Sequence, residues 1–143
     1  MRLTAQNILL SNLRIAAQRR RSWWHLIPPP AVPAWPGIRL DLSGALLLES
    51  SLLGCQLDYA DFTRVQFSGR AYFVGAEFTR VAKFRGAHFT AGVSFEDAQL
   101  SGRADFRDAQ FTGGTNFKDA LFPAGANFRG AQFIGEVSFE GAR

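Results

Sequence analysis

The sequence predicts an all-β solenoid, a chain wound into coils of short strands. Two observations predict it: a register of large apolar residues that never slips, and a small residue two positions before each of them. All 14 phenylalanines lie between residues 62 and 139, at alternating steps of five and six. A repeat of fixed period is typical of solenoids, in which each unit buries its apolar side against its neighbours.

The register also includes leucines, and it continues toward the N-terminus beyond the first phenylalanine. Leu100 fills the one step that has no Phe, and steps of five backwards from Phe62 reach Leu57, Leu52, Leu47 and Leu42. The repeat therefore begins near Gly37, which divides the chain into an N-terminal arm, 1–36, and a repeat region, 37–143. The small or slim residues include Ala60, Val65, Ala71, Ala76, Ala82, Ala87, Val93, Ala98, Ala104, Ala109, Thr115, Ala120, Ala126, Ala131 and Val137.

A long helix and a flat strand both fail to explain this spacing. A step of five turns a helix by roughly 140°, which scatters the Phe over several faces. Residues 62–143 also contain 11 Gly, each costing about 1 kcal/mol inside a helix. In a flat strand an odd step sends successive Phe to opposite faces. The chain must therefore turn once per unit, with the small residue and the Phe both pointing inward.

The number of residues after which the pattern of units repeats predicts that each coil has four sides. Four successive units make one full period, so residues one period apart are expected to stack in columns about 4.7 to 4.9 Å apart. The predicted core columns are Phe62, Phe84, Phe106 and Phe128; Phe67, Phe89, Phe111 and Phe133; Phe73, Phe95, Phe117 and Phe139; and Phe78, Leu100 and Phe122.

Units such as ALLLE, CQLDY, ADFTR, AEFTR, ADFRD and ANFRG resemble those of the pentapeptide-repeat proteins, across about residues 37–143. The resemblance implies a right-handed quadrilateral β-helix. From Phe67 onward every second unit carries an extra residue, as in FSGRAYF and FTGGTNF. We expect regular bulges at two corners of the coil to accommodate these residues.

The N-terminal arm, 1–36, differs sharply from the repeat region. It has no acid, and all of its charge comes from Arg2, Arg14, Arg19, Arg20 and Arg21. Apolar residues from Ile8 to Ala16 recur at helical intervals after Thr4, a residue type that caps helices, which predicts a short amphipathic helix before a proline-rich connection. We expect this helix to cap the first coil. Anchoring to anionic lipid or nucleic acid through Arg19–Arg21 and Trp23–Trp24, and a twin-arginine export signal, are the alternatives.

Length and composition exclude several classes of protein. The chain of 143 residues suits one domain. No apolar stretch approaches the length of a membrane span, roughly 18 residues or more. The one cysteine, Cys55, rules out a disulfide framework and a cysteine-rich zinc site. We expect a cytoplasmic protein with no cofactor.

No arrangement of residues predicts catalysis or a metal site. Cys55 occupies an inward small position, where a thiol is inert. His88 belongs to an outward polar column with Gln66, Gln110 and Gln132. Asp97 and Asp119 share another outward column, where Gly75 and Gly141 indicate a turn, so we interpret them as turn residues rather than as an acid and base pair.

Three arginines form the candidate binding site. Arg85, Arg107 and Arg129 are each one full period apart and are expected to lie on successive coils, facing an acidic partner or phosphates. Asp105 and Asp108 beside Arg107 leave open a plain surface charge network.

The repeat region has 11 basic and 12 acidic residues, a poor imitation of a polyanion, although related proteins include topoisomerase-binding DNA mimics. We therefore predict a non-enzymatic scaffold or protein-interaction module with an unidentified protein partner; the alternative is a regulator of a DNA-associated enzyme such as a topoisomerase. Nucleic acid and membrane are not the favoured partners.

An end-to-end homodimer is expected, because the last coil would expose Phe117, Phe122, Phe128, Phe133 and Phe139.

Overall fold

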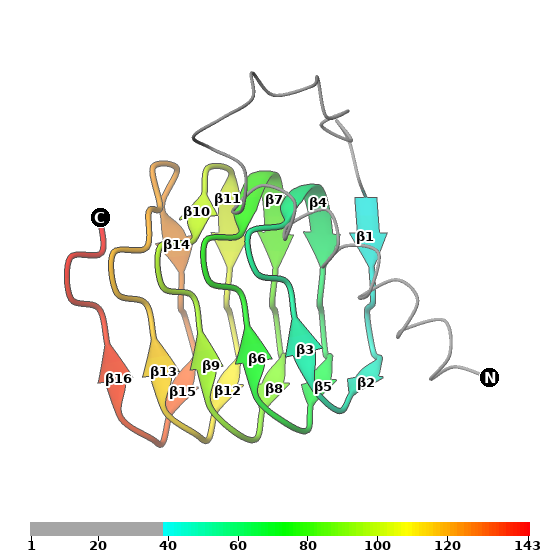
Figure 1. Cartoon of the computed structure of the whole chain (residues 1–143). Helices are drawn as coiled ribbons and strands as arrows, with labels where there is room; N and C mark the ends of the chain where they lie inside the picture. Colours follow the sequence, from blue (N-terminus) through cyan, green and yellow to red (C-terminus); the bar gives the residue numbers. More distant parts are fainter. Residues whose placement is uncertain (1–38) are drawn as a thin grey trace, which may run out of the picture.

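The computed structural model describes residues 39–143, so the predicted arm helix and proline-rich connection lie outside the described residues. Within 39–143 the chain forms only short strands and turns, wound as a solenoid of about five turns. Figure 1 shows the coils side by side, from β1 at one end to β16 at the other. The predicted all-β solenoid is confirmed. In this described part no helix is long and apolar enough to cross a membrane.

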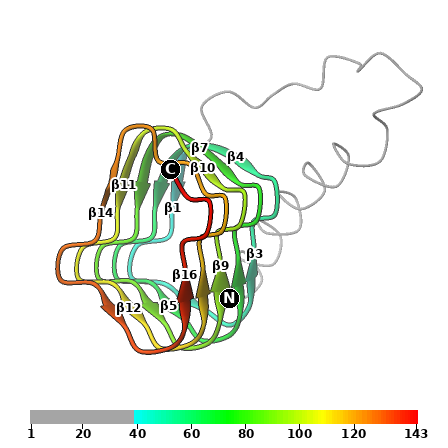
Figure 2. The ribbon, with the colours of Figure 1, turned by 90° about the vertical axis from the view of Figure 1, so that its left-hand side faces the viewer.

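The strands of successive coils pair in parallel to form three sheets. The first sheet contains β1 (Arg39–Asp41), β4 (Gln56–Asp61), β7 (Glu77–Lys83), β11 (Arg103–Asp105) and β14 (Ala126–Asn127), with β10 (Gln99–Leu100) paired to β7. The second contains β2 (Leu46–Leu47), β5 (Gln66–Phe67), β8 (His88–Phe89), β12 (Gln110–Phe111) and β15 (Gln132–Phe133). The third contains β3 (Ser50–Ser51), β6 (Ala71–Tyr72), β9 (Val93–Ser94), β13 (Thr115–Asn116) and β16 (Val137–Ser138). Viewed down the axis, the coils superpose (Figure 2).

The strand register confirms the predicted separation along the chain between residues that stack in one column. In the second sheet Phe67 pairs with Phe89, Phe89 with Phe111 and Phe111 with Phe133. The first coil is shorter because its units are strict fives, so Leu47 pairs with Phe67 across a smaller separation in the chain. A further register shift lies between Leu57 and Tyr59, so a bulge of the predicted kind is found where an extra residue enters the coil.

One turn recurs at two positions of the coil. The Ala76 N–H donates to the Phe73 carbonyl at 3.0 Å, and Gly75 between them has a φ of +62°. A positive φ at the third residue is the type II pattern, which favours Gly and tolerates Asp. Asp97 and Asp119 occupy the same position with φ of +55° and +54°. Their interpretation as turn residues is therefore confirmed.

The core is built from the predicted columns of rings. Phe84 stacks on Phe62 and on Phe106, with ring centroids 4.9 Å apart in both pairs. Between columns the rings meet edge to face, as in Phe84 and Phe95 at 5.3 Å and 90°. Both arrangements are favourable for aromatic rings, and each buried Phe removes about 150 to 250 Å² from water. Burial of this column and its neighbours dominates the stability of the fold.

The last coil corrects one prediction. The sequence predicts that Phe117 is exposed at the C-terminal end, but it is fully buried, because the Phe139 ring stacks on it at 4.9 Å. Phe139 itself is 42% exposed, and Phe122, Phe128 and Phe133 are half-buried. The exposed apolar surface of the last coil is thus smaller than the sequence predicts.

Candidate functional site

The three predicted arginines lie on successive coils, each two residues beyond a strand of the first sheet. Arg85 follows β7, Arg107 follows β11 and Arg129 follows β14. Backbone hydrogen bonds join the coils at this point: Gly86 N–H donates to the Arg107 carbonyl at 2.8 Å and Asp108 N–H to the Arg129 carbonyl at 3.0 Å. The structure thus brings the three residues into one column.

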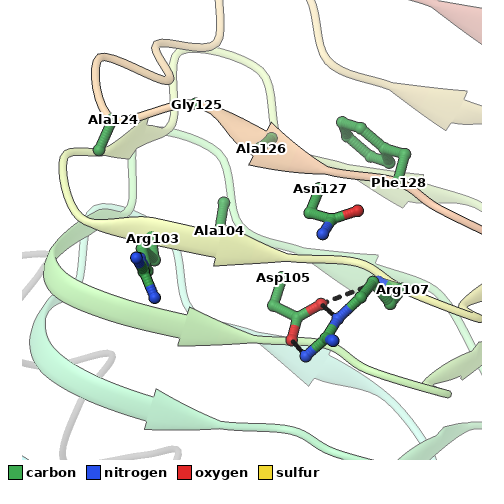
Figure 3. A pocket seen from close by; sticks show the side chains of 9 residues that line it. All are labelled: Arg103, Ala104, Asp105, Arg107, Ala124, Gly125, Ala126, Asn127 and Phe128. Atoms are coloured by element: carbon green, nitrogen blue, oxygen red, sulfur yellow. Dashed lines mark hydrogen bonds and ion pairs between the residues drawn. The ribbon is translucent and has the colours of Figure 1, made fainter.

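Their side chains do not form an uninterrupted row of free guanidinium groups. The Arg107 guanidinium donates from Nε and Nη2 to the Asp105 carboxylate at 2.8 and 2.7 Å, the pair drawn with dashed lines in Figure 3. Hydrogen bonds from the Arg107 side chain hold the pKa of Asp105 below its usual value. Arg85 Nε lies 3.7 Å from Asp108 Oδ2 with both groups well exposed, a pair that contributes little. Only part of the column's charge is available to a partner.

An open hollow of about 620 Å³ lies beside Arg107. Arg103 and Asp105 of β11 line one part of it, and Asn127 and Phe128 line another (Figure 3). Its other lining residues are Arg107 and four Ala or Gly residues, and the Asp105 carboxylate is held by the Arg107 guanidinium. The side chains of Arg103, Arg107 and Asn127 border this open surface.

A second polar cluster on the first sheet escaped the sequence prediction. Lys83 Nζ donates to Tyr59 Oη at 2.7 Å and to Asp61 Oδ2 at 3.2 Å, and Tyr59 Oη donates to Asp61 at 3.1 Å. The Arg39 guanidinium lies over the Tyr59 ring at 4.8 Å, a cation–π distance. Burial raises the pKa of Asp61, but hydrogen bonds from Thr63 and Lys83 outweigh it, so the net pKa is lowered. The separation of one full period between Asp61 and Lys83 is the signal that could have revealed this cluster.

These two clusters belong to one surface, here called the basic face. It comprises residues 39–44, 58–64, 80–86, 103–108 and 126–130, which are β1, β11, β14, the parts of β4 and β7 beyond their register shift, and the turns that follow these strands. These stretches hold eight basic and five acidic residues, whereas the rest of 39–143 holds three basic and seven acidic residues. The near-neutral repeat region therefore has one surface with a net positive charge, and its other surfaces taken together are net negative.

The other predicted candidates lie apart from the basic face. Burial raises the pKa of the Cys55 thiol to about 11, which leaves it protonated and inert at neutral pH. His88 pairs in register with Gln66 and Gln110, and its Nε2 lies 3.4 Å from Thr112 Oγ1. Within residues 39–143 no three His, Cys, Asp or Glu side chains converge as metal ligands.

Comparison with known proteins agrees with this geometry. A family model described as pentapeptide repeats (nine copies) matches residues 52–99 and 95–143. The chain belongs to the pentapeptide-repeat family. No curated protein matches the sequence. The pentapeptide-repeat solenoid is a structural repeat fold, in which identical coils present spaced side chains on fixed faces.

Proposed function

We propose that this pentapeptide-repeat chain is a non-enzymatic interaction module whose basic face binds an acidic protein partner. The excess of eight basic over five acidic residues on that face supports the proposal. Arg85, Arg107 and Arg129 are its central contacts, because their spacing of one coil, about 4.8 Å, is close to that of acidic side chains three residues apart on a helix. An acidic surface could displace the exposed Arg85 and Asp108 pairing at little cost.

The test compares two triple variants with equal loss of charge. Arg85→Ala/Arg107→Ala/Arg129→Ala removes the column, and Arg70→Ala/Lys118→Ala/Arg143→Ala removes the three basic residues of 39–143 that lie off the basic face. Partners are captured from a host extract, and binding of fluorescent poly-L-glutamate is titrated at low and high salt. We expect both kinds of binding to be lost only in the first variant. Equal binding by the two variants would reject the basic face as the site.

The alternative, regulation of a DNA-associated enzyme such as a topoisomerase, needs a different surface. A strongly acidic rod imitates DNA, whereas the described region is nearly neutral and has one positive side. A gyrase supercoiling assay is the direct measurement, and inhibition by excess protein would favour the alternative over the acidic-partner proposal. Membrane attachment through the arm and a cytoplasmic location stay predictions.

We also propose the finer features of the solenoid. A right-handed, four-sided coil is supported by four buried apolar positions per turn, such as Phe84, Phe89, Phe95 and Leu100. An end-to-end homodimer is supported by Val137 and Phe139, inward residues of the last coil that are exposed. Static light scattering tests the dimer, and a monomer mass at all concentrations would contradict it.

A further inference from the structure

Two turns of the coil, half a period apart along the chain, carry opposite charge. In both turns an Ala N–H donates to a Phe carbonyl three residues earlier. Figure 2 shows them on opposite sides of the solenoid, one after β14 and the other after β16. In the last three coils the central residues of the first, here called the basic turn, are Arg85–Gly86, Arg107–Asp108 and Arg129–Gly130. Those of the second, here called the acidic turn, are Glu96–Asp97, Lys118–Asp119 and Glu140–Gly141.

The carboxylates of the acidic turn have no cationic partner among residues 39–143. The four ion pairs of this part of the chain all use carboxylates of the basic face. Glu96 accepts a hydrogen bond from the Asn116 amide at 3.2 Å, and Asp97, Asp119 and Glu140 are exposed. Negative charges on successive coils repel one another, so a partner that supplies cations would be attracted to this turn.

A second copy of the chain has the matching charges at the matching spacing. When a copy is shifted sideways without rotation, its acidic turn meets the basic turn of the first molecule, and both have coils about 4.8 Å apart. The chain runs in opposite directions on opposite sides of a coil, so the facing turns are antiparallel. The first central residue of one turn then faces the second central residue of the other, at heights that agree to within half a coil, about 2.4 Å.

This arrangement places unlike charges opposite one another in each of the last three coils. The facing pairs are Arg85 with Asp97, Arg107 with Asp119, and Asp108 with Lys118. Arg129 faces Gly141, where a Cβ would meet the Asp119 carboxylate, so a carboxylate reaches this position as well. Even the coil that has both signs in each turn is therefore complementary to itself.

The acids of one turn and the arginine column of the other also begin at the same coil. In the first two coils the acidic turn has Leu53–Gly54 and Val74–Gly75, and the basic turn has Ser43–Gly44 and Thr63–Arg64. Arg64 is the one charged residue among these eight. Two molecules at the same height therefore match charge with charge along the whole length of both columns.

We propose that the basic turn binds the acidic turn of a second copy of the chain, side by side. This inference rests on the proposed function, and it names the acidic partner of the basic face. Each molecule in such a pair keeps one free turn of each sign between them, so the contact is heterologous and can extend into a row. The contact is narrow and its charges are exposed, so the association is weak and decreases as salt is added. An end-to-end dimer held by apolar residues would not decrease in this way.

Two charge reversals in the full chain test the contact. Arg85→Glu/Arg129→Glu gives both turns a net negative charge, and Glu96→Lys/Glu140→Lys gives both a net positive charge. None of the four residues has a positive φ, so the exchanges do not strain the turns. Sedimentation equilibrium at low and high salt measures self-association of each variant, and of an equimolar mixture of the two. Circular dichroism establishes that each variant is folded.

The matched control is Arg70→Glu/Arg80→Glu, which changes the net charge by the same amount as the arginine reversal. Both residues are exposed and lie outside the two turns. We expect the wild type and the control to associate at low salt, and each reversal alone to weaken association by about tenfold or more, because like charges then face each other. The mixture should associate again, because turns of opposite sign meet once more.

Three results would overturn the inference. One is a wild type that stays monomeric at low salt, and another is association that survives both reversals. The third is association that only the reversal of the acidic turn removes, since the contact would then not use the arginines.

Binding of fluorescent poly-L-glutamate separates this inference from the proposed function. Glu96→Lys/Glu140→Lys should lose self-association but keep poly-L-glutamate binding, because its basic face is intact. A wild type that binds poly-L-glutamate and stays monomeric would leave the proposed function in place and overturn the inference alone. Self-association with no binding of poly-L-glutamate would support the paired turns and count against a general acidic-partner function.

Discussion

The rings of Phe67 and Phe89 lie nearly parallel, with centroids 4.5 Å apart and planes 4° apart, although a full coil of chain separates them. Their backbones pair in register, so the ring spacing follows the spacing of the strands. Equivalent contacts recur between Phe89 and Phe111 at 5.0 Å and between Phe111 and Phe133 at 4.7 Å, whereas the first coil has Leu47 in this column. The same side chain can therefore fill this position in each of the four later coils.

Truncation of a central ring should be severely destabilising. Phe106 is fully buried between Phe84 and Phe128, at centroid distances of 4.9 and 4.8 Å. We expect Phe106→Ala to reduce the free energy of unfolding by about 3 to 5 kcal/mol, measured by urea titration. Phe139→Ala is the control, because its ring is already partly in water and should cost less than half as much. Equal losses would contradict the column model of the core.

A glycine at an inserted position is needed for close approach of two coils. A Cβ placed on Gly102 would meet the Arg80 carbonyl, whereas one on Gly92 would lie 3.6 Å from its nearest neighbour, an ordinary contact. We expect Gly102→Ala to cost roughly 1 to 3 kcal/mol of unfolding free energy, as overpacking does, and Gly92→Ala to be nearly neutral. A neutral Gly102→Ala would mean that this corner readily changes its backbone conformation.

One arginine occupies a turn position that favours glycine. Arg64 has a φ of +56°, where the other members of its column include Gly44 and Gly86. Relief of this left-handed conformation should make Arg64→Gly stabilising by up to about 1 kcal/mol. Arg80→Gly, in strand β7, should instead destabilise by about 0.5 to 1 kcal/mol. Thermal or urea unfolding of the two variants gives opposite signs if this is correct.

Acid should weaken the contact between Asp105 and Arg107. The pKa of Asp105 is below its usual 3.8, chiefly because the Arg107 side chain donates hydrogen bonds to it. A carboxyl whose folded pKa is depressed stabilises above its unfolded pKa, and the contribution is lost as pH falls through the folded value. We expect Arg107→Ala to raise the pKa of Asp105 in a carboxyl-carbon NMR titration, and Arg103→Ala to leave it in place. An unchanged value in Arg107→Ala would contradict the assigned cause.

Much of the fold follows from the sequence because the period is a property of the backbone. Gln66, His88 and Gln110 are separated by one coil each, so the sequence alone predicts that they lie beside one another. The turn role of Asp97 and Asp119 was predictable because Gly shares their column. Burial of Phe117 was mispredicted, since the ring that covers it, Phe139, belongs to the last winding itself.

The details of the candidate site were not predictable in the same way. Periodicity locates a Cα atom, but an arginine side chain reaches residues on either side of its own coil. Arg107 turns back to Asp105 within its coil, while Arg85 turns toward Asp108 on the next. The Tyr59 cluster combines side chains of two coils, and the period indicates only that Asp61 and Lys83 are neighbours, not that both of their side chains turn to the Tyr59 hydroxyl.

The constant register also governs how such a molecule can change in length. A tandem duplication or deletion of one full period would lengthen or shorten the solenoid by one coil, about 4.8 Å. Each surface side chain would still lie directly beside its equivalent on the neighbouring coil. An insertion of half that length would rotate everything beyond it to the opposite side. Gene duplication can therefore change the length of the solenoid while the kinds of side chain on each of its faces stay the same.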